Sequence, residues 1–219
     1  MDGTGILFDR FAVRSPARYR PLLVPLPNRV SYPELTEAVS AALPTEGPFV
    51  IIAESFSGPI GVRLAARYAG RVVGLVLVNT FVVPPRSRAF RWVPWSYVFA
   101  FPPPRLVVRA LLAGKNAPDQ FVSEVCSAIA QTDARTMHAR LRSILTVNEV
   151  ENLERLPCPV LLLRGTRDRL VTRRSAEVIV RHARHSSTQA LIAPHLLLQT
   201  QPDEAWRAID CFIRDHSIA

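Results

Sequence analysis

Four short apolar runs, rich in β-branched residues, recur along the chain with helical stretches between them. Such runs are typical of strands buried on both faces, and their alternation with helices predicts a parallel sheet covered by helices. The runs are Phe49–Ala53, Val72–Asn79, Val160–Leu163 and Thr188–Ile192. Pro21–Leu26 is a fifth predicted strand, although its prolines remove hydrogen-bond donors from a central position. The sequence therefore predicts an α/β fold.

Three helices have local signals of their own. Apolar spacing predicts a helix over Ile6–Val13, and Ser31 with Glu34 forms a capping-box pattern that opens a helix running to about Leu43. The last helix is predicted to begin at Pro202, because a proline followed by two acidic residues, Asp203 and Glu204, is typical of the first turn of a helix.

Ser55 lies where one predicted strand passes into a helix, in the string FVIIAESFSGPIGVRLAARY. In such a turn the serine has a strained backbone conformation, and small residues two before and two after it let strand and helix approach. Here those residues are Ala53 and Ser57, where the usual pattern has glycine. The turn presents a hydroxyl at the strand's end, so Ser55 is the candidate nucleophile.

A carboxylate and an imidazole follow two later strands. Asp168 comes just after the strand that ends near Gly165, and His195 lies in the loop between the last strand and the last helix. A serine hydroxyl becomes a good nucleophile when an imidazole accepts its proton, and a carboxylate fixes the tautomer of that imidazole and stabilises its charged form. Because the ends of parallel strands meet at one sheet edge, we expect the three side chains to converge.

With these motifs the chain resembles the α/β-hydrolase superfamily over nearly its whole length. The matching strings are DGTG (Asp2–Gly5), AESFSG (Ala53–Gly58), RGTRDRLV (Arg164–Val171) and PHLLLQ (Pro194–Gln199).

The resemblance implies that Ser55 is the nucleophile, His195 the base and Asp168 the orienting acid, with an oxyanion donor in the backbone N–H of Phe56. The expected reaction is hydrolysis of a carboxylic ester or thioester through an acyl-enzyme, which requires neither a metal nor an organic cofactor. A serine in the turn, where relatives that open epoxides or cleave carbon–halogen bonds carry aspartate, argues against those reactions. The alternative is a non-catalytic homologue that only binds.

Other residues of the same types compete less well. Ser57 is followed two residues later by Pro59, which is better placed in the first turn of the next helix. Asp168 could merely cap a turn, but the downstream alternatives Asp203 and Asp210 lie within the predicted last helix. The remaining histidines lack a strand-end setting and are predicted surface residues: His138, His182, His185 and His216.

Residues 82–156 interrupt the α/β pattern. We predict a hydrolase core of residues 1–81 and 157–219 and a helical lid of residues 82–156, which in a resembling hydrolase walls the substrate pocket and excludes water. Its second part, from Asp119 to about Asn148, has helical periodicity. Its first part gathers aromatic residues that either form the lid's own core or line a substrate-binding cleft above Ser55: Trp92, Trp95, Tyr97, Phe99 and Phe101.

The beginning of the chain departs from the resemblance. In the superfamily the loop bearing the second oxyanion donor follows a central strand, and here the sequence starts inside that loop, so the first strands are absent and we expect an N-terminally truncated chain. The missing strand would lie between Pro21–Leu26 and Phe49–Ala53. The second oxyanion donor could then come only from the α-amino group of Met1 or an amide such as that of Asp2.

Charge and composition limit the partners. The chain of 219 residues is 48% hydrophobic, which suits one substantial core, and its formal charge is +9. The arginines are spread along the chain without a basic run or nucleic-acid motif, so nucleic acid is not an expected partner. An acyl carrier protein or a coenzyme A thioester is a possible partner, beside a small-molecule ester as substrate. Lys115 is the only lysine, a bias typical of GC-rich bacterial genes. The arginines near the aromatic cluster are Arg86, Arg88, Arg91, Arg105 and Arg109.

Cysteine usage and hydropathy indicate the compartment. Cys126, Cys158 and Cys211 are scattered and odd in number, which suggests neither a disulfide framework nor a metal site. Asp2, Asp9 and Arg10 stand where a signal peptide would be apolar, and no segment approaches the roughly 20 apolar residues of a membrane span. We therefore expect a cytoplasmic protein.

Overall fold

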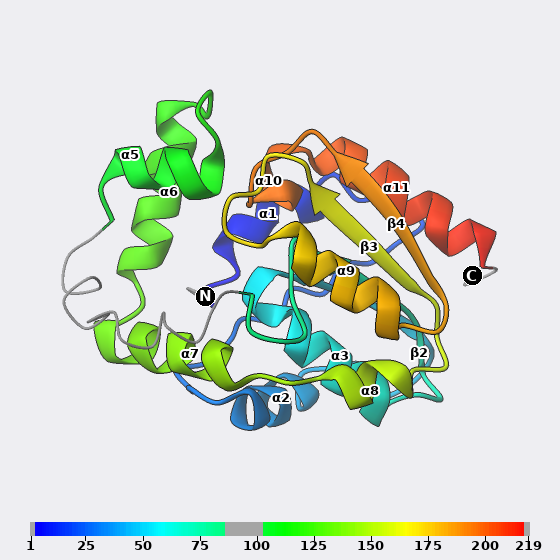
Figure 1. Ribbon diagram of the computed structural model, residues 1–219. Coiled ribbons are helices and arrows are strands. Elements are labelled where there is room, and N and C mark those ends of the chain that lie inside the picture. The colour runs from blue at the N-terminus through cyan, green and yellow to red at the C-terminus, as the bar shows by residue number, and fades with distance from the viewer. Residues whose placement is uncertain (1–2, 86–102, 217–219) are drawn as a thin grey trace.

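A four-stranded parallel sheet forms the centre of the protein (Figure 1). The structure is a computed structural model that describes residues 3–85 and 103–216. The strands follow one another in the order β1-β2-β3-β4, with bounds Phe49–Glu54, Val72–Val78, Val160–Gly165 and Ser186–Leu191. The α/β prediction and its four main strands are confirmed, with ends that differ by one or two residues.

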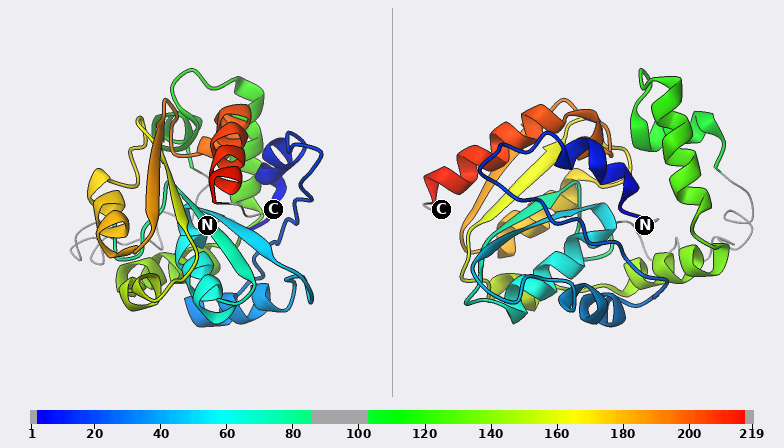
Figure 2. Two further views of the ribbon diagram at one scale, coloured as in Figure 1. Left: turned by 90° about the vertical axis from the view of Figure 1, so that its right-hand side faces the viewer. Right: turned by 180° about the vertical axis from the view of Figure 1, so that it is seen from behind.

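Helices cover both faces of this sheet (Figure 2). On one face lie α3 (Gly58–Arg67), α8 (Val150–Glu154) and α9 (Arg173–His182), and on the other lies α11 (Pro202–Asp215) with the N-terminal segment. Side chains of each strand alternate between these two layers. Leu75, Leu77 and Leu162 therefore pack with Ile179, whereas Val76, Leu161 and Leu163 pack with Trp206 and Ile209.

Local signals set the helix ends. The Ser31 hydroxyl accepts from the N–H of Glu34 while the Glu34 carboxylate accepts from the N–H of Ser31, so the predicted capping box opens α2 (Tyr32–Ser40). This helix ends three residues before the predicted Leu43. The predicted helix over Ile6–Val13 is divided into a 3-10 turn, η1 (Ile6–Phe8), and a short α1 (Asp9–Ala12).

The described part of the insertion is helical. Ahead of α8 it contains α5 (Arg105–Val108), the π-helical turn η4 (Arg109–Ala113), α6 (Asp119–Ala130) and α7 (Ala134–Thr146), which confirms the helical periodicity from Asp119 onward. Elements α5 and α6 pack together beside the carboxyl ends of the strands, and α6 contacts η1 (Figure 2). Trp92, Trp95, Tyr97, Phe99 and Phe101 lie outside the described residues.

The predicted strand at Pro21–Leu26 is wrong. This segment is extended but belongs to no sheet, and β1 pairs only with β2. Within the described residues no backbone hydrogen bond joins residues 20–25 to β1. A strand exists only where its backbone groups find a partner strand, and here none adjoins it. Phe49–Ile52 consequently remain half-buried, whereas all but one of the residues of β2 are buried.

None of the helices in the described ranges is long and apolar enough to cross a bilayer. No group of three or more His, Cys, Asp or Glu side chains within those ranges is placed to hold a metal ion.

Candidate active site

Ser55 lies in a left-handed backbone conformation at the carboxyl end of β1. Its φ is 56°, and the 3-10 turn η2 (Ser55–Ser57) leads directly into α3. A non-glycine residue in this region is strained by about 1–2 kcal/mol. The strain turns the serine out of the strand and presents its hydroxyl at the sheet edge.

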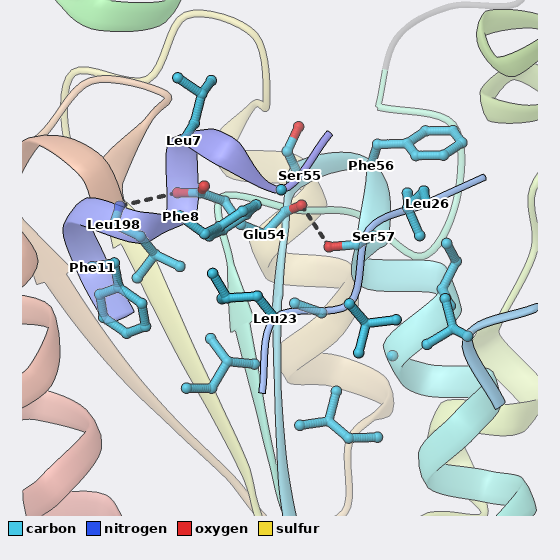
Figure 3. A pocket seen from close by; sticks show the side chains of 18 of the residues that line it. Leu7, Phe8, Phe11, Leu23, Leu26, Glu54, Ser55, Phe56, Ser57 and Leu198 are labelled. Carbon is cyan, nitrogen blue, oxygen red and sulfur yellow. Dashed lines mark hydrogen bonds between the residues drawn. The ribbon is translucent and has the colours of Figure 1, made fainter. Parts of the chain in front are cut away.

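Close approaches hold this turn. A Cβ on Gly58 would lie 1.9 Å from Thr80 Oγ1, and a Cβ on Gly61 would lie 2.8 Å from the Ala53 methyl group. The Thr80 hydroxyl donates to the backbone carbonyl of Ser55. Ala53 therefore has to be small because α3 crosses it at Gly61. Ser57 has another function, since its hydroxyl donates to the carbonyl of Glu54 at 2.8 Å (Figure 3).

Ser55, His195 and Asp168 form one hydrogen-bonded line. The Ser55 Oγ lies 2.7 Å from His195 Nε2, and His195 Nδ1 lies 2.9 Å from Asp168 Oδ2. The His195 and Asp168 side chains are only 4% and 2% exposed. With Nδ1 bound to a carboxylate, the imidazole carries its proton there and leaves Nε2 free to accept the serine proton.

The second oxygen of Asp168 is fixed by its own loop. Its Oδ1 accepts hydrogen bonds from the backbone N–H of Leu170 at 2.8 Å and of Val171 at 3.1 Å. These donors follow the end of β3, so the local turn sets the direction of the carboxylate. Asp168 is thereby oriented independently of His195.

Asn79 joins the ends of three neighbouring segments. It follows β2 with a φ of 42°, and its side chain accepts from the N–H of Gly165 at 2.6 Å. Its amide group donates to the carbonyls of Pro194 at 3.0 Å and His195 at 2.8 Å. Sequence reasoning placed Asn79 at the end of a strand and gave it no function, although a polar pair, Asn79 and Thr80, directly after an apolar run was the available signal.

Glu54 is a second positioning residue that sequence reasoning missed. Its carboxylate accepts from the N–H of Leu198 at 3.0 Å (Figure 3) and from the side-chain amide of Gln199 at 2.8 Å. Burial raises the pKa of the Glu54 carboxyl, and the hydrogen bonds from Leu198 and Gln199 oppose that rise. Glu54 precedes Ser55, and Leu198 comes three residues after His195, so this contact sets the spacing between the two catalytic candidates.

An apolar cavity of about 2190 Å³ opens beside Ser55. Ser55 and Phe56 line it (Figure 3), together with His195, Gly3, Gly5 and residues of the N-terminal segment, β1, α3 and α7. Phe56 follows Ser55, and its buried ring stacks on Tyr32 with ring centres 5.0 Å apart. Met1 and Asp2, the other candidate oxyanion donors, lie outside the described residues.

Among the described residues, none of the competing carboxylates and histidines hydrogen-bonds to Ser55 Oγ, whose imidazole partner is His195. Asp203 forms a long, exposed ion pair with Arg14, and Asp210 accepts from the Tyr19 hydroxyl at 2.7 Å. His182 bonds to Glu154, His216 bonds to the carbonyl of Phe212, His185 is exposed and His138 lies half-buried on α7.

Solved structures with the same fold include several hydrolases. An esterase from Thermogutta terrifontis aligns with a TM-score of 0.78 and 17% identity, covering 97% of this chain and 86% of that one. A hydrolase from Oleispira antarctica aligns with a TM-score of 0.80 and 10% identity, covering 98% of this chain and 88% of that one. The meta-cleavage product hydrolase of Pseudomonas fluorescens IP01 aligns with a TM-score of 0.77 and 14% identity, covering 97% of this chain and 86% of that one.

No curated protein sequence matches the chain. A family model does match, that of the alpha/beta hydrolase family, over residues 3–208. Because that match spans most of the 219 residues, the chain belongs to the alpha/beta hydrolase family.

Proposed function

We propose that this hydrolase cleaves a carboxylic ester through an acyl-enzyme, with Ser55 as nucleophile, His195 as general base and Asp168 as orienting acid. The observation that carries the proposal is the line of hydrogen bonds from Ser55 Oγ through His195 to Asp168, at 2.7 and 2.9 Å. These are the contacts that proton transfer from a serine hydroxyl requires.

In the first half of the reaction Ser55 Oγ attacks the ester carbonyl while its proton passes to His195 Nε2. The tetrahedral oxyanion collapses, the bond to the leaving alcohol breaks, and His195 returns the proton to that alcohol. In the second half water attacks the acyl-serine, His195 takes the water proton, and the acid is released with Ser55 restored.

The oxyanion needs at least one donor, and the backbone N–H of Phe56 is our candidate. It lies in the first helical turn after Ser55, where N–H groups have no partner inside the helix. Met1 or Asp2 is proposed for the second donor. Losing one such donor lowers turnover about a hundredfold to a thousandfold.

The apolar residues that line the cavity favour a substrate with an apolar acyl group. Leu7, Leu26 and Leu196 line the cavity together with Ser55 (Leu7 and Leu26 are seen in Figure 3). We propose that Trp92, Trp95, Tyr97 and Phe99 of the insertion contribute further to this wall.

A thioester of coenzyme A or an acyl carrier protein is the less favoured substrate. Arg105 and Arg109, two of the arginines that would attract such an anionic partner, both pair with Asp119 through Oδ1. This single carboxylate offsets one of the two positive charges, so Arg105 and Arg109 attract an anionic carrier less than two unpaired arginines would.

A fluorophosphonate probe tests the proposal directly, because it phosphonylates a serine only when a base activates it. We expect labelling of Ser55 in the unaltered chain and none in Ser55→Ala, while Ser57→Ala keeps the labelling. Absence of label on the folded, unaltered chain would favour the alternative, a homologue that binds without turnover.

Two substrates then separate ester from thioester hydrolysis. We expect turnover of a short p-nitrophenyl ester and little turnover of an acyl-coenzyme A thioester. Arg109→Glu, which also breaks the pair with Asp119, should leave ester cleavage within a few-fold. Loss of activity only on carrier-bound substrate would reverse this assignment.

A further inference from the structure

One arginine interrupts the buried face of α7. Met137, Arg140 and Ile144 recur at intervals of three and four residues and are all buried, and Arg140 is 0% exposed. A guanidinium cannot be deprotonated in a protein, so burying it costs free energy unless hydrogen bonds replace those that it made with water. An apolar side chain would complete this face of the helix without that cost. The packing of α7 alone therefore does not call for an arginine here.

The guanidinium of Arg140 reaches from α7 to the N-terminal segment. Its Nη2 donates to the carbonyl of Pro27 at 2.6 Å, and its Nε donates to the carbonyl of Arg29 at 3.2 Å. The Ser143 hydroxyl, three residues further along α7, donates to the carbonyl of Val30 at 2.8 Å. The N-terminal segment is thus docked on α7 by two side chains, and Ser143 offers a matched control for Arg140.

Arg140 also contacts Phe56, the residue after the candidate nucleophile. The guanidinium carbon lies 5.8 Å from the centre of the Phe56 ring, within the range of a cation–π contact. Tyr32 stacks on the same ring, and Ile144 of α7 packs in the same apolar cluster. The Ser55 φ of 56° is a strained conformation, which persists only where surrounding contacts fix it. The contacts of the Phe56 ring supply such a constraint.

The same guanidinium lies against Gly3. A Cβ on Gly3 would be 2.8 Å from Arg140 Nη1 and 2.9 Å from the carbonyl oxygen of Leu26, whose N–H donates to the Gly3 carbonyl at 2.8 Å. Gly3 has a φ of 80°, a conformation that suits glycine. Figure 3 shows Leu26 beside Phe56, and the two side chains pack in one apolar cluster. The backbone at Gly3 and the turn at Phe56 therefore meet around Arg140.

We propose that Arg140 is a positioning residue for the oxyanion site, where it sets the separation of the two backbone segments that supply the donors. One segment carries Phe56, and the other carries Gly3 and its neighbour Asp2. The inference rests on the proposed acyl-enzyme chemistry, because an oxyanion forms only when the Ser55 hydroxyl attacks a carbonyl. Arg140 acts through these two segments without touching the substrate, so α7 of the insertion contributes to catalysis from behind the site.

Correct placement of these donors has a large effect on rate. Donors stabilise the tetrahedral oxyanion when they lie about 2.7–3.1 Å from it, and a displacement of roughly 1 Å can cost about a hundredfold. The carbonyl oxygen of the bound ester carries less charge than the oxyanion, so displaced donors weaken binding of the transition state more than binding of the substrate. Loss of Arg140 should therefore lower kcat with little change in KM.

The first test measures kcat and KM for a short p-nitrophenyl ester in Arg140→Met and Arg140→Lys. Methionine is an unbranched side chain without charge or donors, whereas lysine keeps the charge but not the planar fork of donors. We expect kcat to fall about tenfold to a hundredfold in Arg140→Met and less in Arg140→Lys, with KM within about threefold. Ser143→Ala, which removes a bond between the same two segments, and Arg142→Met, on the exposed side of α7, should leave kcat unchanged.

Two results of this test would overturn the inference. Circular dichroism and Tm first establish which variants are folded. An unaltered kcat in folded Arg140→Met would show that the donors keep their places without the guanidinium. An equal loss of kcat in Ser143→Ala would show that docking of the N-terminal segment on α7, rather than the contacts of Arg140 with Phe56 and Gly3, supports catalysis.

A change on the other side of the contact covers the case in which Arg140→Met fails to fold. Gly3→Ala and Gly5→Ala introduce the same backbone strain, at φ values of 80° and 79°, but only the Cβ of Gly3 would meet Arg140. In a double-mutant cycle with Arg140→Lys, the loss of kcat from Gly3→Ala should be smaller than it is alone, as for residues in contact, whereas the loss from Gly5→Ala should add. Additive losses for both glycines would contradict the proposal.

An NMR measurement separates this inference from the proposed function, because it needs no turnover. Residual dipolar couplings report the direction of each N–H bond, and those of Phe56 and Gly3 should both change in Arg140→Lys and stay the same in Ser143→Ala and Arg142→Met. If the unaltered chain cleaves no ester, the proposed function fails, while the couplings still decide whether Arg140 orients the two N–H groups. Unchanged couplings in Arg140→Lys would overturn the inference even in an active hydrolase.

Discussion

The side-chain amide of Asn79 donates a hydrogen bond of 2.8 Å to the backbone carbonyl of His195. The residue that follows β2 thus holds the loop carrying the imidazole that faces Ser55. The same side chain accepts from the N–H of Gly165, three residues before Asp168. One buried carboxamide therefore fixes the two loops that bring the base and the acid together, so the geometry of the site depends on a residue that does not touch the nucleophile.

Replacing Asn79 should lower turnover more than it weakens binding. Asn79→Gly keeps the backbone free to adopt a φ of 42° but leaves two carbonyls and one N–H without their partner, each at about 1–3 kcal/mol. Asn79→Ala has the same loss plus roughly 1 kcal/mol of backbone strain. We expect both variants to reduce kcat about tenfold or more, with a smaller change in KM. In urea unfolding, Asn79→Gly should have the higher free energy of unfolding of the two. An unaltered kcat in a folded Asn79→Gly protein would show that the loops carrying His195 and Asp168 keep their positions without the Asn79 side chain.

Asp168→Asn should keep the fold and lose most of the activity. An amide in this place favours the wrong tautomer of His195 and cannot stabilise the imidazolium, which in comparable sites lowers kcat by about 10⁴. The matched control is Asp203→Asn, on the exposed surface of α11, which should leave kcat unchanged. Ester hydrolysis at pH 7 measures both, and similar rates for the two variants would remove Asp168 from the mechanism.

The strained backbone of Ser55 predicts that the enzyme is less stable than it could be. Ser55→Gly relieves the positive φ of 56°, whereas Ser55→Ala retains it. Both variants should be inactive, but we expect the glycine variant to have a free energy of unfolding about 1 kcal/mol above that of the alanine variant. Chemical denaturation of the two inactive proteins measures this difference, and an alanine variant as stable as glycine would mean that the turn is not under strain.

Glu54 should make stability decrease as pH rises above about 4.3, the usual pKa of a glutamate in an unfolded chain. Burial raises its pKa in the folded protein, so the unfolded chain loses this proton first. The stabilisation contributed by protonated Glu54 is complete below the unfolded pKa and is lost as pH rises through the folded one.

Glu54→Gln removes this titration and can still accept from the N–H of Leu198, while the unpartnered Oε1 of Gln199 can accept from the new amide. Relative to the unaltered chain, the variant should therefore gain stability steadily from acid to neutral pH. Urea unfolding at several pH values between 4 and 8 checks the direction. If the difference in free energy of unfolding between the two proteins did not change with pH, Glu54 would have the same pKa in the folded and unfolded states.

Much of the fold could be predicted from sequence because its signals are local. The apolar runs that became β1 to β4, the Ser31 and Glu34 capping box, and the Pro-Asp-Glu start of α11 each depend on residues within a few positions of one another. The candidate site could also be predicted, because Ser55, Asp168 and His195 each follow a strand and parallel strands end at one edge.

What local patterning could not decide depends on contacts between distant residues. The segment Pro21–Leu26 has the residues of a strand but no neighbour to pair with, and pairing is a property of the sheet rather than of the segment. Nor could the sequence assign Glu54 and Asn79, because a polar residue at a strand end gains a function only when a remote loop brings its partner within hydrogen-bond distance. The order of residues thus determined the strands, the helix starts and the presentation of Ser55, while tertiary packing alone decided which edge stays open and which side chains hold His195 in place.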